Sequence, residues 1–541
     1  MIKKISFVAI IAAALMSGAM PVKAGNATAR PKLVVGVVID QMRWDYLYRY
    51  RSRYGEGGFN RLLAEGFSCE NTRLPYVPSV TAIGHTCIYT GSVPSIHGIA
   101  GNNFVKDGVE VYCTDDKTVK PVGTKGKAAL MSPRNLWVTT IGDEMKIASN
   151  GRAKVVGVAL KDRASILPAG HSADGAYWFD DETGNFVTSS FYMDRLPQWV
   201  SNFNKEKRPA HYLSTAWTTL YDASTYTEST ADDTNYEKSI KDGVKPTLPL
   251  DLPSLYKKYG YSIIRNTPMG NSLTLDLAKA AIDNEQLGAD DETDLLTVSC
   301  SSTDYIGHQV GTHAVEIEDT YLRLDRDLAD FFAYLDKKVG KGNWLLFLSA
   351  DHGAMNNSTY LQDRRIPAGY WSKEDETKKL NAMLSKVYPG GPDIVKMVLN
   401  YQVFLNHDVI KSRGLDLQRI KQTLVDSLKT DPAVLYACDM ETAQTAPIPD
   451  DVRTRIVNGY CRGRSGDITV VLKPNWYDHG TKGTGHGAWN PYDTHIPLVF
   501  MGWGIEHGET TRPTYMTDIS ATIAALLHIQ APNGCVGQPI F

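Results

Sequence analysis

The stretch Leu33-Val34-Val35-Gly36-Val37-Val38-Ile39, which ends at Asp40, decides the fold of this 541-residue chain. Its apolar residues follow one another without alternation, as is typical of a parallel-sheet strand that is covered on both faces. Similar runs recur at Lys154–Leu160, Leu295–Cys300, Trp344–Ser349 and Ile496–Met501. Helical patterns separate these runs, so the sequence predicts an α/β fold built on a parallel sheet.

Two of the helices are defined most clearly by their patterns. The longer one is expected from about Ala314 to Val339, where apolar residues recur at steps of three and four and Gly340 follows as a C-cap. The other is expected at Ile519–Leu527, with Thr517 and Asp518 as its cap.

Two regions interrupt the alternation of strands and helices. The first, at about 177–284, is rich in Tyr, Thr, Ser, Asp and Trp, and the second, at about 354–477, contains a helix and a strand of its own. We interpret both as insertions over the carboxyl edge of the sheet, where specificity usually resides. Two independent domains are the alternative, which we favour less because candidate site residues lie on both sides of each insertion.

The N-terminal residues 1–24 have the pattern of a secretory signal peptide. Lys3 and Lys4 precede a short apolar run, and Val22-Lys23-Ala24 resembles a cleavage site. The alternative, a membrane anchor, needs a longer apolar run. We therefore expect a periplasmic or secreted chain of residues 25–541 that forms one catalytic domain and has no membrane anchor.

Charge and cysteine content restrict the function further. Removing the three lysines of residues 1–24 changes the formal net charge from −3 to −6, which gives no electrostatic footprint for nucleic acid. The seven cysteines form no CxxC motif, so a cysteine zinc finger is not expected. In an oxidising compartment some should pair, with Cys69–Cys113 and Cys438–Cys461 as our expected pairs, and the odd count leaves at least one unpaired.

Carboxylates and imidazoles lie beside several of the predicted strands. The candidate metal ligands are Asp40, Asp304, His308, Asp351, His352 and His486. Such a set at the carboxyl edge of a sheet suits two tetrahedral Zn²⁺ ions, since imidazole favours zinc over magnesium or calcium. Each residue alone could equally be a turn former or helix cap. Further histidines, His85, His97, His171, His313, His479 and His495, are expected to be structural or to support the ligands.

Thr81 is the candidate nucleophile, because a hydroxyl at a helix N-terminus gains from the helix dipole and from free N–H groups. The alternatives are that Thr81 is only the N-cap, or that Ser79 is the cap. Lys161 and Arg163 follow a strand at alternate positions, so an extended backbone would point both toward one phosphoryl group. Asn102 offers a further amide donor, or simply occupies a turn.

Taken together, these segments resemble the alkaline phosphatase superfamily, and most closely its phosphate-insensitive (PafA-type) bacterial zinc phosphomonoesterases. The matching stretches are Val37–Arg43, Pro78–His85, Tyr89–Ile99, Lys161–Arg163, Asp304–His308, Ala350–Gly353 and Gly485–Gly487. They span nearly the whole mature chain in the family's order.

The resemblance implies a role for each candidate residue. Thr81 would form a phosphothreonine intermediate, with Asn102, Lys161 and Arg163 contacting the phosphoryl oxygens. One zinc would be held by Asp304, His308 and His486, and the other by Asp40, Asp351, His352 and Thr81. The resemblance also implies an alkaline phosphatase-like sandwich with a mainly parallel central sheet between helices, a monomer, and phosphate monoesters as substrates.

Three other functions fit the sequence less well than a phosphomonoesterase. A type I phosphodiesterase or nucleotide pyrophosphatase shares the metal ligands and the threonine, but Lys161 and Arg163 favour a dianionic monoester. A sulfatase requires a C-x-P-x-R or S-x-P-x-R motif, whereas this chain has Pro78-Ser79-Val80-Thr81. A secreted binding protein with structural metals would not need the complete set of nucleophile and phosphate ligands.

Overall fold

β1 (Leu33–Ile39) lies inside the main sheet, and all seven of its residues are buried. It pairs in parallel with β10 on one side and with β11 on the other. Each buried Val, Leu or Ile side chain contributes about 1.5–3 kcal/mol relative to an exposed one. The computed structural model describes residues 29–541, so the expected signal peptide, residues 1–24, lies outside the described residues.

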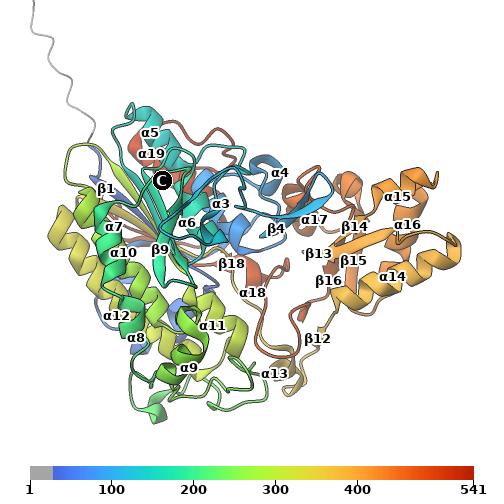
Figure 1. Ribbon diagram of the computed structural model, residues 1–541, viewed down its shortest axis with the longest axis horizontal. Coiled ribbons are helices and arrows are strands. Elements are labelled where there is room, and N and C mark those ends of the chain that lie inside the picture. The colour runs from blue at the N-terminus through green and yellow to red at the C-terminus, as the bar shows by residue number, and fades with distance from the viewer. Residues whose placement is uncertain (1–28) are drawn as a thin grey trace, which may run out of the picture. The chain divides into compact units, whose positions relative to one another are not determined.

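Within residues 31–541, ten strands form the main sheet, and its central part is parallel (Figure 1). In spatial order the strands are β20 (Gly508–Thr510), β2 (Phe67–Cys69), β19 (Leu498–Gly502), β11 (Trp344–Ser349), β1, β10 (Asp294–Cys300), β7 (Val155–Ala159), β8 (Gly175–Asp180), β9 (Asn185–Ser189) and β6 (Pro121–Val122). The five strands from β11 to β8 run parallel to one another. The expected α/β fold with a mainly parallel sheet is therefore confirmed.

The last predicted strand differs in detail. The run Ile496–Met501 divides into β18 (His495–Ile496), which pairs with β3 (Thr72–Arg73), and β19 of the main sheet. β19 runs antiparallel to β11. A continuous apolar run reports burial on both faces and not strand direction, which is why the sequence indicated a parallel strand here.

Helices cover both faces of the main sheet. α10 (Met269–Glu285) and α12 (Val315–Leu335) lie on one side, and α5 (Ile141–Ala148) and α19 (Asp518–Leu527) lie on the other (Figure 1). The two helices defined most clearly by the sequence are thus confirmed as α12 and α19. α12 ends at Leu335, however, and a π-helical turn, Asp336–Gly340, follows it, so Gly340 is not the C-cap that the sequence predicted. The cap of α19 is not, because Thr517 has helical backbone angles and its side chain makes no capping hydrogen bond.

Gly36 allows a helix to pack closely on β1. A Cβ at this position would lie 2.3 Å from the Tyr89 hydroxyl oxygen and 2.5 Å from the Phe347 ring. Tyr89 belongs to α3 (Thr81–Thr90), and its hydroxyl donates to the Gly36 carbonyl oxygen at 3.2 Å. The glycine therefore sets the distance between α3 and the strand that ends at Asp40.

The region 354–477 contains a second, four-stranded sheet with the order β13-β14-β16-β15. Its strands are β13 (Val395–Leu399), β14 (Gln402–Leu405), β16 (Ile468–Leu472) and β15 (Val434–Asp439), and its larger helices are α14 (Lys373–Val387) and α16 (Leu417–Leu428). Leu380, Ile420 and Val403 belong to a separate apolar core between this sheet and its helices.

The region 177–284 begins inside β8, and both β8 and β9 belong to the main sheet. After β9 the chain forms α7 (Gln198–Lys205) and, two residues later, α8 (Arg208–Tyr212). A long, mostly irregular connection then leads to α9 (Leu252–Tyr259), which precedes α10.

The expected disulfides Cys69–Cys113 and Cys438–Cys461 are not formed, since all seven cysteines are free. Cys69 lies in β2 and Cys438 in β15, whereas Cys113 and Cys461 lie outside the helices and strands, so separation along the chain was no guide to their positions in space. Burial raises the pKa of the Cys69 thiol to about 12. Among residues 29–541 no helix combines the length and the apolar character that crossing a membrane requires.

Candidate active site

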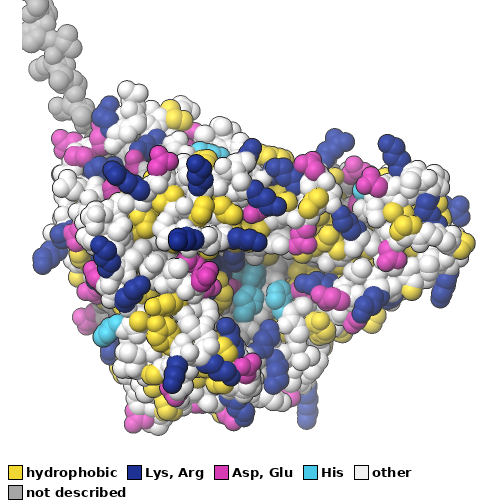
Figure 2. Space-filling view, in the orientation of Figure 1, with side chains coloured by type: hydrophobic (Ala, Val, Ile, Leu, Met, Phe, Trp, Pro, Cys, Tyr) yellow, Lys and Arg dark blue, Asp and Glu magenta, His cyan; other side chains and the backbone are white. Residues whose placement is uncertain are grey.

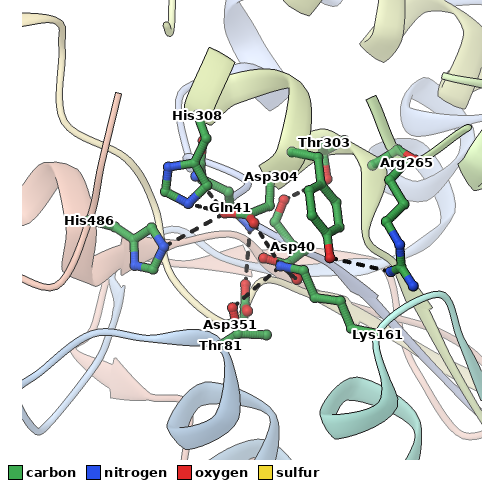
Figure 3. Close-up of polar contacts among 12 residues, drawn as sticks. Asp40, Gln41, Thr81, Lys161, Arg265, Thr303, Asp304, His308, Asp351 and His486 are labelled. Atoms are coloured by element: carbon green, nitrogen blue, oxygen red, sulfur yellow. Dashed lines mark hydrogen bonds and ion pairs between the residues drawn. The ribbon is translucent and has the colours of Figure 1, made fainter. Parts of the chain in front are cut away.

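Four parallel strands bring polar side chains to the same edge of the main sheet. Asp40 follows β1, Asp351 lies two residues after β11, and Lys161 lies two residues after β7. Asp304 is in the first turn of α11 (Ser302–Val310), the helix after β10. The side chains converge because the carboxyl ends of parallel strands meet at one edge (Figure 3). Figure 2 shows histidine side chains in a hollow of the molecular surface.

Thr81 is the first residue of α3, and the extended Val80 precedes it. Neither Thr81 nor Ser79 is therefore the N-cap. The Thr81 hydroxyl oxygen lies 3.4 Å from His352 Nε2 and 3.5 Å from Lys161 Nζ. This arrangement places an alcohol at the positive end of a ten-residue helix, next to an imidazole and an ammonium group.

Asn102 also lies at this helix end. Its side-chain oxygen accepts a hydrogen bond from the main-chain N–H of Ala82 at 2.9 Å, which satisfies one of the free donors at the start of α3. The oxygen is thereby committed to the helix, and the amide NH₂ group of Asn102 is the part that can donate to a ligand.

Three histidines of the site have their Nδ1 atoms fixed by main-chain carbonyl oxygens. The distances are 2.9 Å from His308 to Thr484, 2.9 Å from His352 to Gly353, and 2.7 Å from His486 to Ser79. Because a carbonyl oxygen can only accept, each Nδ1 carries the proton, and each neutral ring has its lone pair on Nε2. Burial lowers the pKa of His352 and of His486, which favours these neutral rings.

The first candidate metal group comprises Asp304, His308 and His486. Ligand atoms of these three residues all lie within 4.8 Å of one another. Asp304 Oδ1 is 3.2 Å from His308 Nε2 and 3.7 Å from His486 Nε2. The sequence correctly placed Asp304 and His308 on one face of a helix, since both belong to α11. Burial acts to raise the pKa of Asp304, and the charge of Lys161 acts to lower it.

The second group contains Asp40, Asp351 and His352, all fully buried. His352 Nε2 lies 3.3 Å from Asp351 Oδ2 and 3.7 Å from Asp40 Oδ1. Neither of these carboxylate oxygens has a hydrogen-bond partner. Asp304 is close to this group as well, because Asp40, Asp304 and His352 also offer ligand atoms within 4.8 Å of one another. The two groups therefore meet at Asp304.

Lys161 lies between the two candidate metal groups and contacts a carboxylate of each. Its Nζ is 2.7 Å from Asp40 Oδ2 and 2.6 Å from Asp304 Oδ2, so it leaves the Oδ1 atoms of both to face the histidines. Burial acts to lower the pKa of Lys161, but these two carboxylates raise it above its ordinary value. The ammonium group is therefore charged.

Arg163 does not extend beside Lys161 as the sequence suggested. α6 (Asp162–Ala169) begins directly after Lys161, so the backbone is helical where an extended one was expected. The side chains of Lys161 and Arg163 consequently have different partners, and Arg163 Nη1 donates to the Tyr112 hydroxyl at 2.8 Å. The structure thus brings Lys161 directly against the carboxylates, and Arg163 against a tyrosine.

Several contacts at the site involve residues that the sequence did not single out. Gln41 donates from its main-chain N–H to Asp351 Oδ1 at 3.1 Å and from Nε2 to Asp304 Oδ1 at 2.6 Å. The Tyr305 ring lies 5.0 Å from Lys161 Nζ, and Arg265 donates to its hydroxyl at 3.3 Å. Adjacency to Asp40 and Asp304 was the only available signal for Gln41 and Tyr305.

Two histidines expected to be structural or supporting contact the site. His85 Nδ1 lies 3.4 Å from Asp351 Oδ2, and its Nε2 is 2.9 Å from the Ser299 hydroxyl oxygen. The His479 ring stacks on His308 with 5.5 Å between ring centroids.

Comparison with known proteins identifies the family. Residues 34–496 match the family model described as type I phosphodiesterase / nucleotide pyrophosphatase. The chain belongs to this family. Alkaline phosphatase PafA of Elizabethkingia meningoseptica is 51% identical over 532 residues, with 97% of each chain covered. Alkaline phosphatase PhoV of Synechococcus elongatus is 51% identical over 517 residues, which cover 95% of this chain and 92% of that protein.

A protein named calcium-transporting ATPase, from Myroides odoratus, is 53% identical over 525 residues, with 96% of both chains covered. The crystal structure of wild-type alkaline phosphatase PafA has a TM-score of 0.93 at 51% identity and covers 95% of this chain and 99% of that one. These relatives confirm the resemblance of this family member to PafA-type alkaline phosphatases. Murine ectonucleotide pyrophosphatase / phosphodiesterase 5 shares the fold, with a TM-score of 0.51 at 14% identity.

Proposed function

We propose that this chain is a zinc-dependent alkaline phosphatase that hydrolyses phosphate monoesters through a phosphothreonine intermediate on Thr81. The observation that carries the proposal is that three Nε2 lone pairs face carboxylate oxygens, and that one of them, on His352, also lies beside the Thr81 hydroxyl. The likeness to alkaline phosphatases over nearly the whole chain supports the same reaction class.

The donor atoms fit divalent cations. A neutral imidazole lone pair and a carboxylate oxygen repel each other unless a cation lies between them, and imidazole with carboxylate is a typical zinc ligand set. We assign Asp304, His308 and His486 to one zinc, and Asp40, Asp351 and His352, with Thr81, to the other. When bound, two such ions lower the pKa of a hydroxyl group or water and stabilise the departing oxygen.

In the first step Thr81 attacks the phosphorus of the monoester. The bond between Thr81 Oγ1 and phosphorus forms while the bond from phosphorus to the alcohol oxygen breaks. The hydroxyl proton passes to solvent, and the alcohol takes up a proton as it leaves. The start of α3 and the amide of Asn102 provide donors for the negative oxygens of the transferred group.

In the second step a water molecule attacks the phosphothreonine from the side that the alcohol has left. A bond from the water oxygen to phosphorus forms, the bond to Thr81 Oγ1 breaks, and Thr81 regains a proton. Phosphate is released. Lys161, held between two carboxylates beside Thr81, adds a fixed positive charge in both steps.

Loss of the nucleophile tests the proposal. We expect Thr81→Ala to lower turnover of p-nitrophenyl phosphate by at least about 10³-fold, because no other hydroxyl replaces it. The bound zinc, measured by elemental analysis, should remain largely unchanged since six other ligands persist. Unchanged monoesterase activity in a clean preparation of this variant would contradict the assignment.

The second candidate function is a phosphodiesterase, which the family description favours. A diester carries one phosphoryl charge fewer and needs room for a second substituent. We propose instead that Lys161, which lies 3.5 Å from Thr81 Oγ1, and Arg163 both contact phosphoryl oxygens of a dianionic monoester. We therefore expect kcat/KM for p-nitrophenyl phosphate to exceed that for bis-p-nitrophenyl phosphate by at least about 10²-fold. The reverse preference would establish the diesterase.

The location and assembly of the protein form part of the proposal. We propose that residues 1–24 are removed as a signal peptide and that the mature chain acts as a monomer in the periplasm or outside the cell. N-terminal sequencing of the purified protein and its sedimentation coefficient test these two points.

A further inference from the structure

Among residues 29–541, the side chain of Arg163 donates a hydrogen bond to Tyr112 alone. Arg163 Nη1 donates to the Tyr112 hydroxyl oxygen at 2.8 Å, and the guanidinium carbon lies 6.0 Å from the centre of the tyrosine ring. Tyr112 is the last residue of β5 (Val109–Tyr112), a strand outside both large sheets.

The guanidinium group of Arg163 hydrogen-bonds to a neutral partner, the Tyr112 hydroxyl, and not to an acid. Within the described part of the chain no carboxylate forms an ion pair with it, in contrast to Lys161, which has two. Its Nε is buried and has no hydrogen-bond partner. A buried guanidinium with an unused donor is suited to an anionic ligand, because planar Arg donors match phosphoryl oxygens well.

The hydroxyl group of Tyr112 is held in one orientation. It donates to Asp162 Oδ1 at 2.9 Å, and the Thr114 hydroxyl donates to the same oxygen at 2.8 Å. Its hydrogen is therefore committed to Asp162, and its lone pairs face Arg163. Burial raises the pKa of Tyr112 well above its ordinary value, so the phenol stays neutral and does not cancel the charge of Arg163.

The same hairpin carries the amide donor of the site. β4 (Asn103–Lys106) begins directly after Asn102 and pairs with β5, with Asn103 opposite Tyr112. The main-chain N–H of Cys113 donates to the Asn102 carbonyl oxygen at 2.9 Å. The base of one hairpin thus connects Asn102 with the residue that holds Arg163.

From these contacts we infer that Tyr112 is a positioning residue, which holds Arg163 through a neutral hydrogen bond so that its full charge meets the extra oxygen of a dianionic monoester. The inference rests on the proposed function. It makes the hairpin of β4 and β5 a determinant of the preference for monoesters over diesters, since a diester has its corresponding oxygen esterified.

The test compares two variants on two substrates. We expect Tyr112→Phe to lower kcat/KM for p-nitrophenyl phosphate about tenfold, the usual effect of one hydrogen bond to a charged group, and to change that for bis-p-nitrophenyl phosphate less than about twofold. Thr114→Val is the matched control, because it removes the other donor to Asp162 without touching Arg163. It should leave both constants within about twofold of wild type.

A double-mutant cycle separates positioning from a general structural effect. In an Arg163→Ala background, Tyr112→Phe should have no further effect on monoester hydrolysis, because its action passes through Arg163. Equal effects in both backgrounds, or an equal loss on both substrates, would overturn the inference. A slow Arg163→Ala variant beside a normal Tyr112→Phe variant also overturns it and leaves the proposed function intact. A normal Arg163→Ala variant contradicts the phosphoryl contact in the proposed function itself.

Discussion

Gln41 connects the two candidate metal groups at the scale of a single residue. Its main chain has φ of 65°, in the left-handed region, and this turn directs its N–H to Asp351 and its side-chain amide to Asp304. Gly307 makes room for the side chain, since a Cβ there would lie 2.0 Å from Gln41 Oε1. The strain of a positive φ is thus tolerated next to Asp40, where one residue donates to a carboxylate of each candidate metal group.

The contacts of Gln41 predict the effect of removing its side chain. We expect Gln41→Ala to lower kcat about 10- to 100-fold, as is usual when a residue that orients metal ligands is lost. Zinc affinity, measured by competition with a chelator, should fall as well. Gln422→Ala on α16 is a control, because this residue is exposed and its side-chain amide donates to Asp426, far from the site in the sequence and outside the main sheet. Wild-type turnover and zinc affinity in Gln41→Ala would contradict this role.

At the scale of elements, the sequence was most informative where residues are buried. The bounds of β1 and β11 were predicted residue for residue, because short, continuous apolar runs rich in Val, Leu and Ile are typical of buried strands. The prediction of an extended segment after β7 was wrong, because nothing in Lys161-Asp162-Arg163 distinguishes such a segment from the start of a helix. Tyr112 could not have been found, since long-range contacts alone define its partners, and Gln41 had only its position next to Asp40 as a signal.

His97, the last residue of α4 (Pro94–His97), should make the unfolding free energy of the protein depend on pH. His97 is fully buried, and its Nδ1 accepts a hydrogen bond from the main-chain N–H of Ile99 at 3.1 Å, which requires a neutral ring. Burial, with the charge of Arg464, lowers the pKa of His97 to about 3. In the unfolded chain the pKa is about 6.5, so below that pH the unfolded state binds a proton that the folded state does not.

The unfolding free energy should therefore fall as pH decreases from about 6.5 toward 3, and it should lose nothing through His97 above that range. Between pH 7.5 and 5 we expect wild type to lose about 2 kcal/mol more than His97→Gln, as measured by urea unfolding. Other titrating groups are common to both proteins and cancel. An equal loss in both would show that His97 does not remain neutral in the folded state.

At the scale of the whole molecule, residues far apart in the sequence meet at one edge of the main sheet. Asp40 and Asp351 follow neighbouring strands, Asp304 begins the helix after the next strand, and His486 comes from a loop after the second sheet. The parallel arrangement explains how the sequence predicted the members of the site without their contacts. It also means that three buried carboxylates lie close together, with Lys161 as the cation that contacts two of them.

This arrangement predicts that metal removal affects stability as well as activity. Ions that bind the folded chain but not the unfolded one stabilise it by mass action, and here they would also neutralise carboxylates from separate parts of the sheet. We expect a chelator to lower Tm by about 5 °C and to abolish hydrolysis of p-nitrophenyl phosphate. Added Zn²⁺ should restore both, whereas Mg²⁺ alone should not, because imidazole ligands favour zinc. Thr81→Ala should show the same shift in Tm without activity, since six other ligands remain. A Tm that changes with neither chelator nor added zinc would contradict a resident metal. Loss of the cations would leave the carboxylates at the edge of the main sheet uncompensated, and this must lower the stability of the folded chain.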